Sequence, residues 1–317
     1  MNWLKLAAAL TIMLIVQGAS LTRALADDCV PDPGPKYQPI AGLKNDGFPV
    51  CYFAPNDANK GAYTALQSRH ILEAYSQFLS PLHLPHPLTL VALNCQPDFH
   101  SDSPFYSSGD RALHFCYEWY NVVLQWAPKE PTPEGVTRGN VITGMWAGTL
   151  LHETGHAMFD MLDVPVFGRE EDAADEVAAF IALQFNKDVA RTIIKGFAYF
   201  WEMAAKAGND PPTATRANPP KDAEQRCFTD PLCAYADVHG TASQRLYNTL
   251  CLGYGGDRET FKDFVQMKWL PQARADGCER EYHQLEFAFV KTIGPFIDPD
   301  LRKKVQSIQW LQPTEMQ

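Results

Sequence analysis

The sequence lacks the short motifs that mark several large enzyme classes. It contains no G-x-S-x-G nucleophile elbow, no G-x-x-x-x-G-K-[S/T] phosphate loop and no G-x-G-x-x-G dinucleotide fingerprint. Its eight cysteines form no C-x-x-C pair, which argues against a cysteine zinc site. Internal repeats and coiled-coil heptads are also missing. The sequence therefore gives no support for serine-hydrolase, phosphate-loop or dinucleotide-dependent chemistry.

A long apolar run is also missing after residue 26, where no stretch approaches the roughly 20 residues that cross a bilayer. The first 26 residues carry Lys5, then the apolar run 6–16, then Ala24-Leu25-Ala26. This order is typical of a secretory signal peptide. The alternative is an uncleaved membrane anchor, but the run is too short to span a bilayer. We therefore expect an exported protein, periplasmic or secreted, with no membrane span once the signal is removed.

Basic residues are fewer than acidic ones: the sequence has 27 Lys and Arg against 37 Asp and Glu, which gives a net charge of −10. Removal of the signal would take away Lys5 and Arg23, and would lower the net charge to −12. A surface of this sign repels nucleic acid and anionic lipid. We therefore expect no nucleic-acid partner.

All of the cysteines follow the predicted signal peptide. An even number of cysteines in an exported chain indicates disulfides, here four. Pairing in sequence order is our expectation, and free buried thiols are the alternative. The expected disulfide pairs are Cys29 with Cys51, Cys95 with Cys116, Cys227 with Cys233, and Cys251 with Cys278.

The spacing of apolar residues predicts an α+β fold, with a small sheet early in the chain and helices after it. Strands are predicted at 88–93 and 111–116, after an extended lead-in over 27–50. Helices are predicted at 59–79, 117–126, 141–163, 170–185, 193–206, 243–252, 258–267 and 279–293. The domain prediction is a signal peptide over 1–26, a core over 27–206, a proline-rich loop over 207–226, and a helical part of the same catalytic unit over 227–317.

The strongest chemical motif is H-E-x-x-H, in Leu151-His-Glu-Thr-Gly-His156. Four helical residues turn the chain by about 400°, so His152 and His156 lie on one face, one turn apart. Two imidazoles placed in this way can both reach one zinc ion at ~2.0–2.1 Å. Glu153 is rotated off that axis, so it is predicted to be the general base that takes a proton from water. The alternative is a helix with two surface histidines, but the apolar flanks predict a buried helix whose polar side chains need partners.

A third ligand is predicted in the segment Arg169-Glu-Glu-Asp-Ala-Ala-Asp-Glu176. Glu171 and Asp175 are four residues apart and share a helix face. Glu171 would complete a His₂Glu site, and Asp175 would accept the N–H of a ligating histidine. Glu170 is the rival ligand and would point about 100° away. An ordinary acidic helix N-terminus is the structural alternative.

These residues resemble the gluzincin group of metallopeptidases, in which an H-E-x-x-H helix is followed by a helix with a glutamate ligand and an aspartate four residues later. The chain is most similar to a bacterial metallopeptidase family, over roughly residues 45–295. This resemblance implies a zincin-like fold. The shared segments are His152-Glu-Thr-Gly-His-Ala157, Gly168-Arg-Glu-Glu-Asp-Ala-Ala-Asp175, Cys116-Tyr-Glu118, Gln244-Arg245, Tyr247-Asn248 and Cys278-Glu-Arg-Glu-Tyr282.

The resemblance also implies two further parts of a peptidase site. An edge strand before Cys116 would pair with substrate, although Pro104 in that stretch cannot donate a ladder hydrogen bond. A histidine or tyrosine would stabilise the oxyanion; His239 is our preferred candidate and Tyr247 the alternative. Glu118 is predicted either to lie buried beside the active helix or to begin a helix.

We therefore interpret the chain as a peptidase that uses one zinc ion to hydrolyse peptide or protein substrates. Two other interpretations remain open from the residues alone. One is a zincin scaffold that serves as a binding or envelope module, and the other is a zinc hydrolase of a non-peptide amide. Glu153 favours an enzyme, because metal ligation alone does not need it.

Overall fold

The structure, a computed structural model, describes residues 47–95, 103–209 and 238–307. The predicted signal peptide and most of the predicted proline-rich loop lie outside the described residues. The chain divides into two compact units, one up to Asn121 and the other from Val122.

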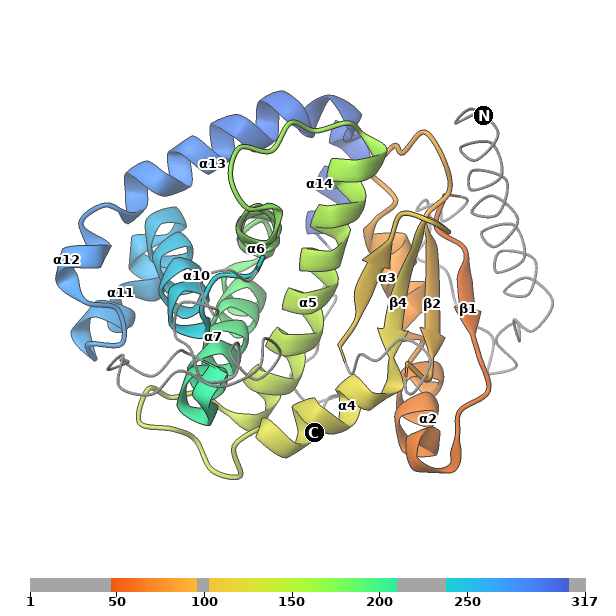
Figure 1. Ribbon diagram of the computed structural model, residues 1–317. Helices are drawn as coiled ribbons and strands as arrows, with labels where there is room; N and C mark the ends of the chain where they lie inside the picture. Colours follow the sequence, from red (N-terminus) through yellow and green to blue (C-terminus); the bar gives the residue numbers. More distant parts are fainter. Residues whose placement is uncertain (1–46, 96–102, 210–237, 308–317) are drawn as a thin grey trace, which may run out of the picture. The chain divides into compact units, whose positions relative to one another are not determined.

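The first unit contains a four-stranded sheet in the order β1-β2-β4-β3. Neighbours β1, β2 and β4 are parallel, and β3 runs antiparallel to β4 at one edge. In Figure 1, helix α3 lies behind this sheet, and helix α2 lies below the lower ends of its strands. The elements are β1 (Val50–Tyr52), α2 (Lys60–Ser68), α3 (Ile71–Phe78), β2 (Thr89–Leu93), β3 (Phe105–Ser107) and β4 (Ala112–Cys116), with the short 3-10 helix η1 (Asp57–Asn59) before α2.

The two predicted strands are confirmed within one residue, as β2 and β4. The single helix predicted over 59–79 is wrong, because His70 adopts a left-handed φ of 52° and separates α2 from α3. Such a break leaves the apolar spacing on either side intact, so periodicity does not reveal it. The apolar spacing predicted neither β1 nor β3, since three residues are too few to show alternation. Strand β3 lies at a sheet edge in the stretch before Cys116, where the family resemblance implies an edge strand.

Glu118 lies in the first turn of helix α4 (Tyr117–Trp126), where its carboxylate accepts hydrogen bonds from other residues of the first unit. Its Oε1 accepts a hydrogen bond from Asn59 Nδ2 at 2.8 Å, and its Oε2 accepts one from the backbone N–H of Cys95 at 3.0 Å. Cys95 is itself bonded to Cys116, the residue just before α4. The carboxylate thus ties the start of α4 to the end of β2.

Two of the four predicted disulfides are confirmed. Cys95–Cys116 and Cys251–Cys278 have Cα–Cα distances of 5.2 and 5.1 Å, as a disulfide requires. The other two predicted pairs include Cys29, Cys227 and Cys233, which lie outside the described residues.

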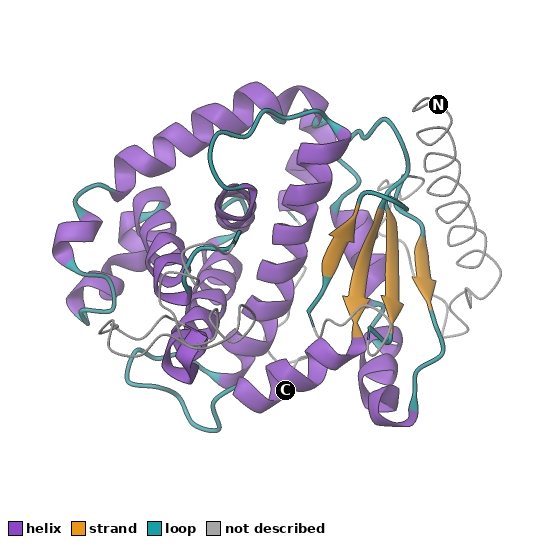
Figure 2. Ribbon diagram, viewed as in Figure 1, coloured by secondary structure: helices purple, strands orange, loops and turns teal. Residues whose placement is uncertain are grey.

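The second unit consists, in its described part, of helices joined by loops (Figure 2). The molecule is therefore α+β, with one small sheet and mainly helical content. None of the described helices combines the length and hydrophobicity that crossing a membrane requires. The elements are α5 (Arg138–Met161), α6 (Glu170–Ala182), α7 (Lys187–Ala204), η2 (Ala205–Asn209), α10 (Ala242–Gly256), α11 (Arg258–Gln266), α12 (Gln272–Ala275), α13 (Cys278–Thr292), η3 (Gly294–Phe296) and α14 (Pro299–Gln306).

Helix α5 carries the H-E-x-x-H motif and packs closely against both α6 and α7. At Gly155 a Cβ atom would meet the Ala174 Cα at 3.1 Å, so α5 and α6 approach each other through small residues. Gly196 of α7 contacts α5 at Gly144 in the same way. This close packing fixes the relative position of the helices that carry the candidate site.

Gly196→Ala is therefore expected to lower the free energy of unfolding by about 1–3 kcal/mol, as overpacked helix interfaces do. A Cβ atom at this position would lie 1.8 Å from the carbonyl oxygen of Asn140, which is backbone and cannot rotate away. Urea denaturation measures the change. Gly61→Ala is the control, because nothing lies within 4 Å of its Cβ position, and stability there should be unchanged or slightly higher. Equal stability of Gly196→Ala and wild type would contradict the close contact.

Candidate metal centre

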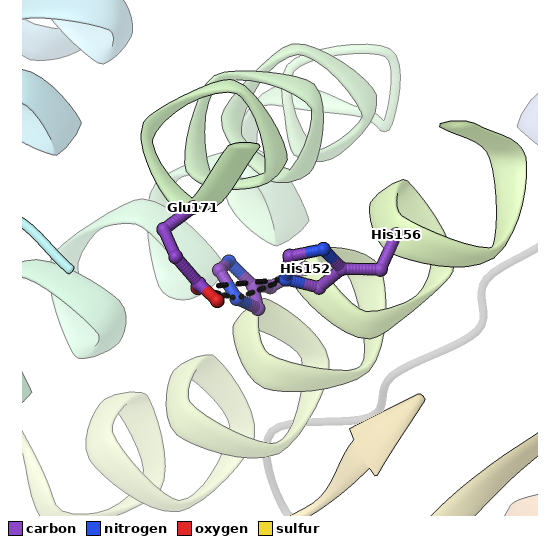
Figure 3. Close-up of side chains that lie close together, drawn as sticks. All are labelled: His152, His156 and Glu171. Carbon is purple, nitrogen blue, oxygen red and sulfur yellow. Dashed lines mark hydrogen bonds and ion pairs between the residues drawn. The ribbon is translucent and has the colours of Figure 1, made fainter. Parts of the chain in front are cut away.

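Three side chains from two helices converge at one point in the second unit (Figure 3). His152 and His156 lie one turn apart on α5, and Glu171 comes from the first turn of α6. The two Nε2 atoms are 3.2 Å apart, and the Glu171 Oε2 is 3.1 Å from His152 Nε2 and 3.5 Å from His156 Nε2. Among the described residues these form a group that could hold a metal ion.

The spacing of these donor atoms fits one face of a zinc tetrahedron. Ligands at ~2.0–2.1 Å from a tetrahedral zinc ion lie roughly 3.3 Å from one another. The three measured distances, 3.1, 3.2 and 3.5 Å, scatter around that value. Two imidazole nitrogens and one carboxylate are also a donor set that catalytic zinc sites use.

The outer nitrogens of both imidazoles face carboxylates from α6. His152 Nδ1 lies 2.9 Å from Asp175 Oδ1, and His156 Nδ1 lies 2.8 Å from Glu170 Oε1. Because a carboxylate accepts, each Nδ1 donates a hydrogen to its partner on α6. A cation at the shared point would replace the hydrogens between the two Nε2 atoms and Glu171, and the three atoms would then act as electron-pair donors to it.

Hydrogen bonds and nearby charges favour the ionised forms of His152 and Glu171, and burial opposes them. Burial alone would lower the pKa of His152, but its hydrogen bonds to Asp175 and Glu171 and the nearby negative charges raise that pKa to about 9. Burial opposes the change at Glu171 too, yet hydrogen bonds from His152, His156 and His239 hold the pKa of its carboxyl far below the usual range. The surroundings therefore favour positive charge at this point.

Glu153 lies beside the three donor atoms without joining them. Its side chain is buried, and its Oε1 is 4.0 Å from His152 Nε2. This distance is longer than the 3.1 to 3.5 Å that separate the three donor atoms, so the carboxylate lies next to the donor group and outside it. The placement agrees with the helical rotation that the sequence predicts.

His239 also reaches the site, at the same Glu171 oxygen that faces His152 and His156. Its Nε2 lies 3.2 Å from Glu171 Oε2, and its side chain is 48% exposed. Arg169 at the start of α6 donates to the His239 carbonyl oxygen at 3.1 Å. The alternative candidate, Tyr247, makes no hydrogen bond or ion pair with the three donor residues in the part of the chain that the structure describes.

Two residues have contacts that sequence reasoning missed. Glu170 was considered only as a rival ligand, whereas it contacts the outer nitrogen of His156. Arg245 of α10 donates to Asp175 through Nε at 2.5 Å and Nη2 at 2.6 Å. Glu170 could have been found from its place beside Glu171. The partner of Arg245 lies 70 positions away in the sequence, and no local pattern links the two.

A family model described as "putative metallopeptidase" matches residues 52–292. The matched region includes every residue of the candidate site. Neither the curated proteins nor the solved structures contain a match to the chain.

Proposed function

Because the chain belongs to the putative metallopeptidase family, we propose that it is a zinc-dependent peptidase of the gluzincin type, with a zincin-like catalytic unit. The ligands would be His152, His156 and Glu171. A bound zinc ion supplies a Lewis acid that polarises the scissile carbonyl and lowers the pKa of water. The observation that carries this proposal is the triangle of donor atoms with edges of 3.1 to 3.5 Å.

Glu153 would act as the general base. Its position 4.0 Å from His152 Nε2 would put a carboxylate within reach of a water molecule held next to the donor group. It would take a proton from that water as the water attacks, and would deliver a proton to the leaving amine.

His239 would bind the developing oxyanion. Its half-exposed imidazole lies beside Glu171 and so faces the region where substrate would enter. A donor placed here stabilises negative charge that exists only in the transition state. The hydrogen bond from the Arg169 guanidinium group to the His239 carbonyl oxygen would hold the His239 segment at this position.

The C-terminal helices would belong to the same catalytic unit as the ligand helices. Arg245, in α10, contacts Asp175 in α6, so a residue from beyond the predicted proline-rich loop supports the candidate site. The proposed setting is outside the cytoplasm, and the two disulfides among the described residues are compatible with export.

Removal of the metal is expected to abolish peptide hydrolysis, and added zinc is expected to restore it. The test starts with metal analysis of the purified chain, which should give about one zinc ion per molecule. Digestion of a peptide library is then followed by mass spectrometry before chelation, after chelation and after zinc is returned. Cleavage that survives complete metal removal would rule out the proposed function.

The same experiment separates the two rival interpretations. Bound zinc with no cleavage of any peptide would favour a binding module. Zinc-dependent hydrolysis of N-acyl amides in a parallel assay, without peptide cleavage, would favour a non-peptide amidase.

A further inference from the structure

Arg245 is a buried cation whose guanidinium group is directed at the candidate metal centre. Its side chain is 8% exposed, and that of its partner Asp175 is 7% exposed. The pair is bidentate, with Nε bound to Oδ2 at 2.5 Å and Nη2 bound to Oδ1 at 2.6 Å. Asp175 Oδ1 also faces His152 Nδ1 at 2.9 Å. A continuous chain of contacts therefore runs from α10 through α6 to a predicted zinc ligand on α5.

Both ends of Arg245 are fixed. The guanidinium carbon lies 3.7 Å from the ring centroid of Trp201, so the aromatic face covers one side of the cation. The backbone is fixed by a capping box in which Thr241 and Gln244 bond each other's backbone N–H groups at the start of α10. This gives a physical reason for the neighbouring pair Gln244-Arg245, since Gln244 completes the capping box of α10 and Arg245 follows it in the helix.

A buried carboxylate needs such a partner for two reasons. Burial disfavours the charged form of Asp175, and Arg245 compensates because its guanidinium group bonds both carboxylate oxygens. A carboxylate that bonds only one histidine can also rotate about its terminal torsion. The planar guanidinium group binds both oxygens at once and fixes the plane of the carboxylate.

We propose that Arg245 is a positioning residue of the metal centre. By holding Asp175 in one plane, it sets the orientation of the His152 ring and so directs Nε2 at the metal. This inference rests on the proposed function, because it requires that His152, His156 and Glu171 bind zinc. The Trp201 ring limits the guanidinium to the position that reaches Asp175.

A lysine at position 245 would keep the positive charge and lose the second hydrogen bond. Arg245→Lys is therefore expected to weaken zinc binding by roughly 10- to 100-fold, the range seen when outer contacts of metal ligands are removed. Zinc affinity is measured in the full chain by competition with a chromophoric chelator. Absorption spectra of the cobalt-loaded protein provide a second readout, because the visible bands of cobalt report the geometry of its ligands.

The chain offers a matched control in Arg191, which binds Asp263 through both terminal nitrogens and also lies over aromatic rings. This pair joins α7 to α11, and neither residue contacts the three donor residues in the described part of the chain. Arg191→Lys is expected to lower thermal stability, as Arg245→Lys also should. Its zinc affinity and cobalt spectrum should match those of the wild type.

The outcomes distinguish failure of the proposed zinc site from failure of the proposed role of Arg245. If the wild type binds no zinc, the proposed function fails. If the wild type binds zinc and Arg245→Lys, with normal circular dichroism, matches it in affinity and cobalt spectrum, then the role of Arg245 alone is overturned. If Arg245→Lys does not fold, Trp201→Phe provides the second variant. The inference is also overturned if the cobalt spectra of Trp201→Phe and Arg191→Lys both match that of the wild type.

Discussion

Glu171→Gln is expected to weaken zinc binding by more than roughly 100-fold and to abolish hydrolysis. A loss of roughly 100-fold is the largest expected when a residue that only contacts a metal ligand is replaced, and Glu171 is itself a proposed ligand. The substitution keeps the size of the side chain and removes the charge that two imidazoles face at 3.1 and 3.5 Å. An amide oxygen is a much poorer donor to zinc than a carboxylate. Competition with a chromophoric chelator measures the affinity, and peptide cleavage is assayed on the same samples.

The adjacent residue provides the control. Glu170→Gln makes the same chemical change one position earlier in α6, at a side chain that is 57% exposed and contacts only the outer nitrogen of His156 among the site residues. We expect a loss of about 10-fold in zinc affinity, at the lower end for outer contacts, because solvent can replace this hydrogen bond. A larger loss in Glu170→Gln than in Glu171→Gln would reverse the two roles.

Glu153→Gln is expected to lower kcat by about 10²- to 10⁴-fold, the usual contribution of a general base. Zinc content and zinc affinity should stay at wild-type levels, because Glu153 Oε1 lies 4.0 Å from the nearest ligand nitrogen and outside the donor triangle. Initial rates on a fluorogenic peptide chosen from the library digest give kcat and KM separately. Glu171→Gln serves as the contrast, since it should lose metal and activity together.

Two results would contradict this role for Glu153. Cleavage by Glu153→Gln at the wild-type rate would exclude the residue as the base. Loss of zinc from the same variant would show that the carboxylate contributes to metal binding, and the fall in rate would then not report proton transfer.

The sequence predicted the inner part of the candidate site because its spacing follows helix geometry. Residues four apart share a helix face, so His152 pairs with His156, and Glu171 with Asp175. The structure brings these side chains together across one close contact of small residues, Gly155 against Ala174. The position of the third donor followed from the same rule applied to the next helix.

The outer part of the site could not be predicted in this way. Arg245 lies 70 positions from Asp175, and only tertiary packing of α10 against α6 brings the two together. A local pattern does not predict short strands such as β3, for a related reason. Pairing with β4, and not alternation of apolar residues, makes those three residues extended. Pro104 is compatible with this strand because it precedes Phe105, the first residue of an edge strand.

The most direct measurement is a crystal structure of the purified chain with anomalous scattering recorded at the zinc absorption edge. One anomalous peak is expected, at about 2.0–2.2 Å from His152 Nε2, His156 Nε2 and a Glu171 carboxylate oxygen. A zinc peak bound elsewhere, or coordinated by Glu170 in place of Glu171, would contradict a shared cation at the meeting point of α5 and α6.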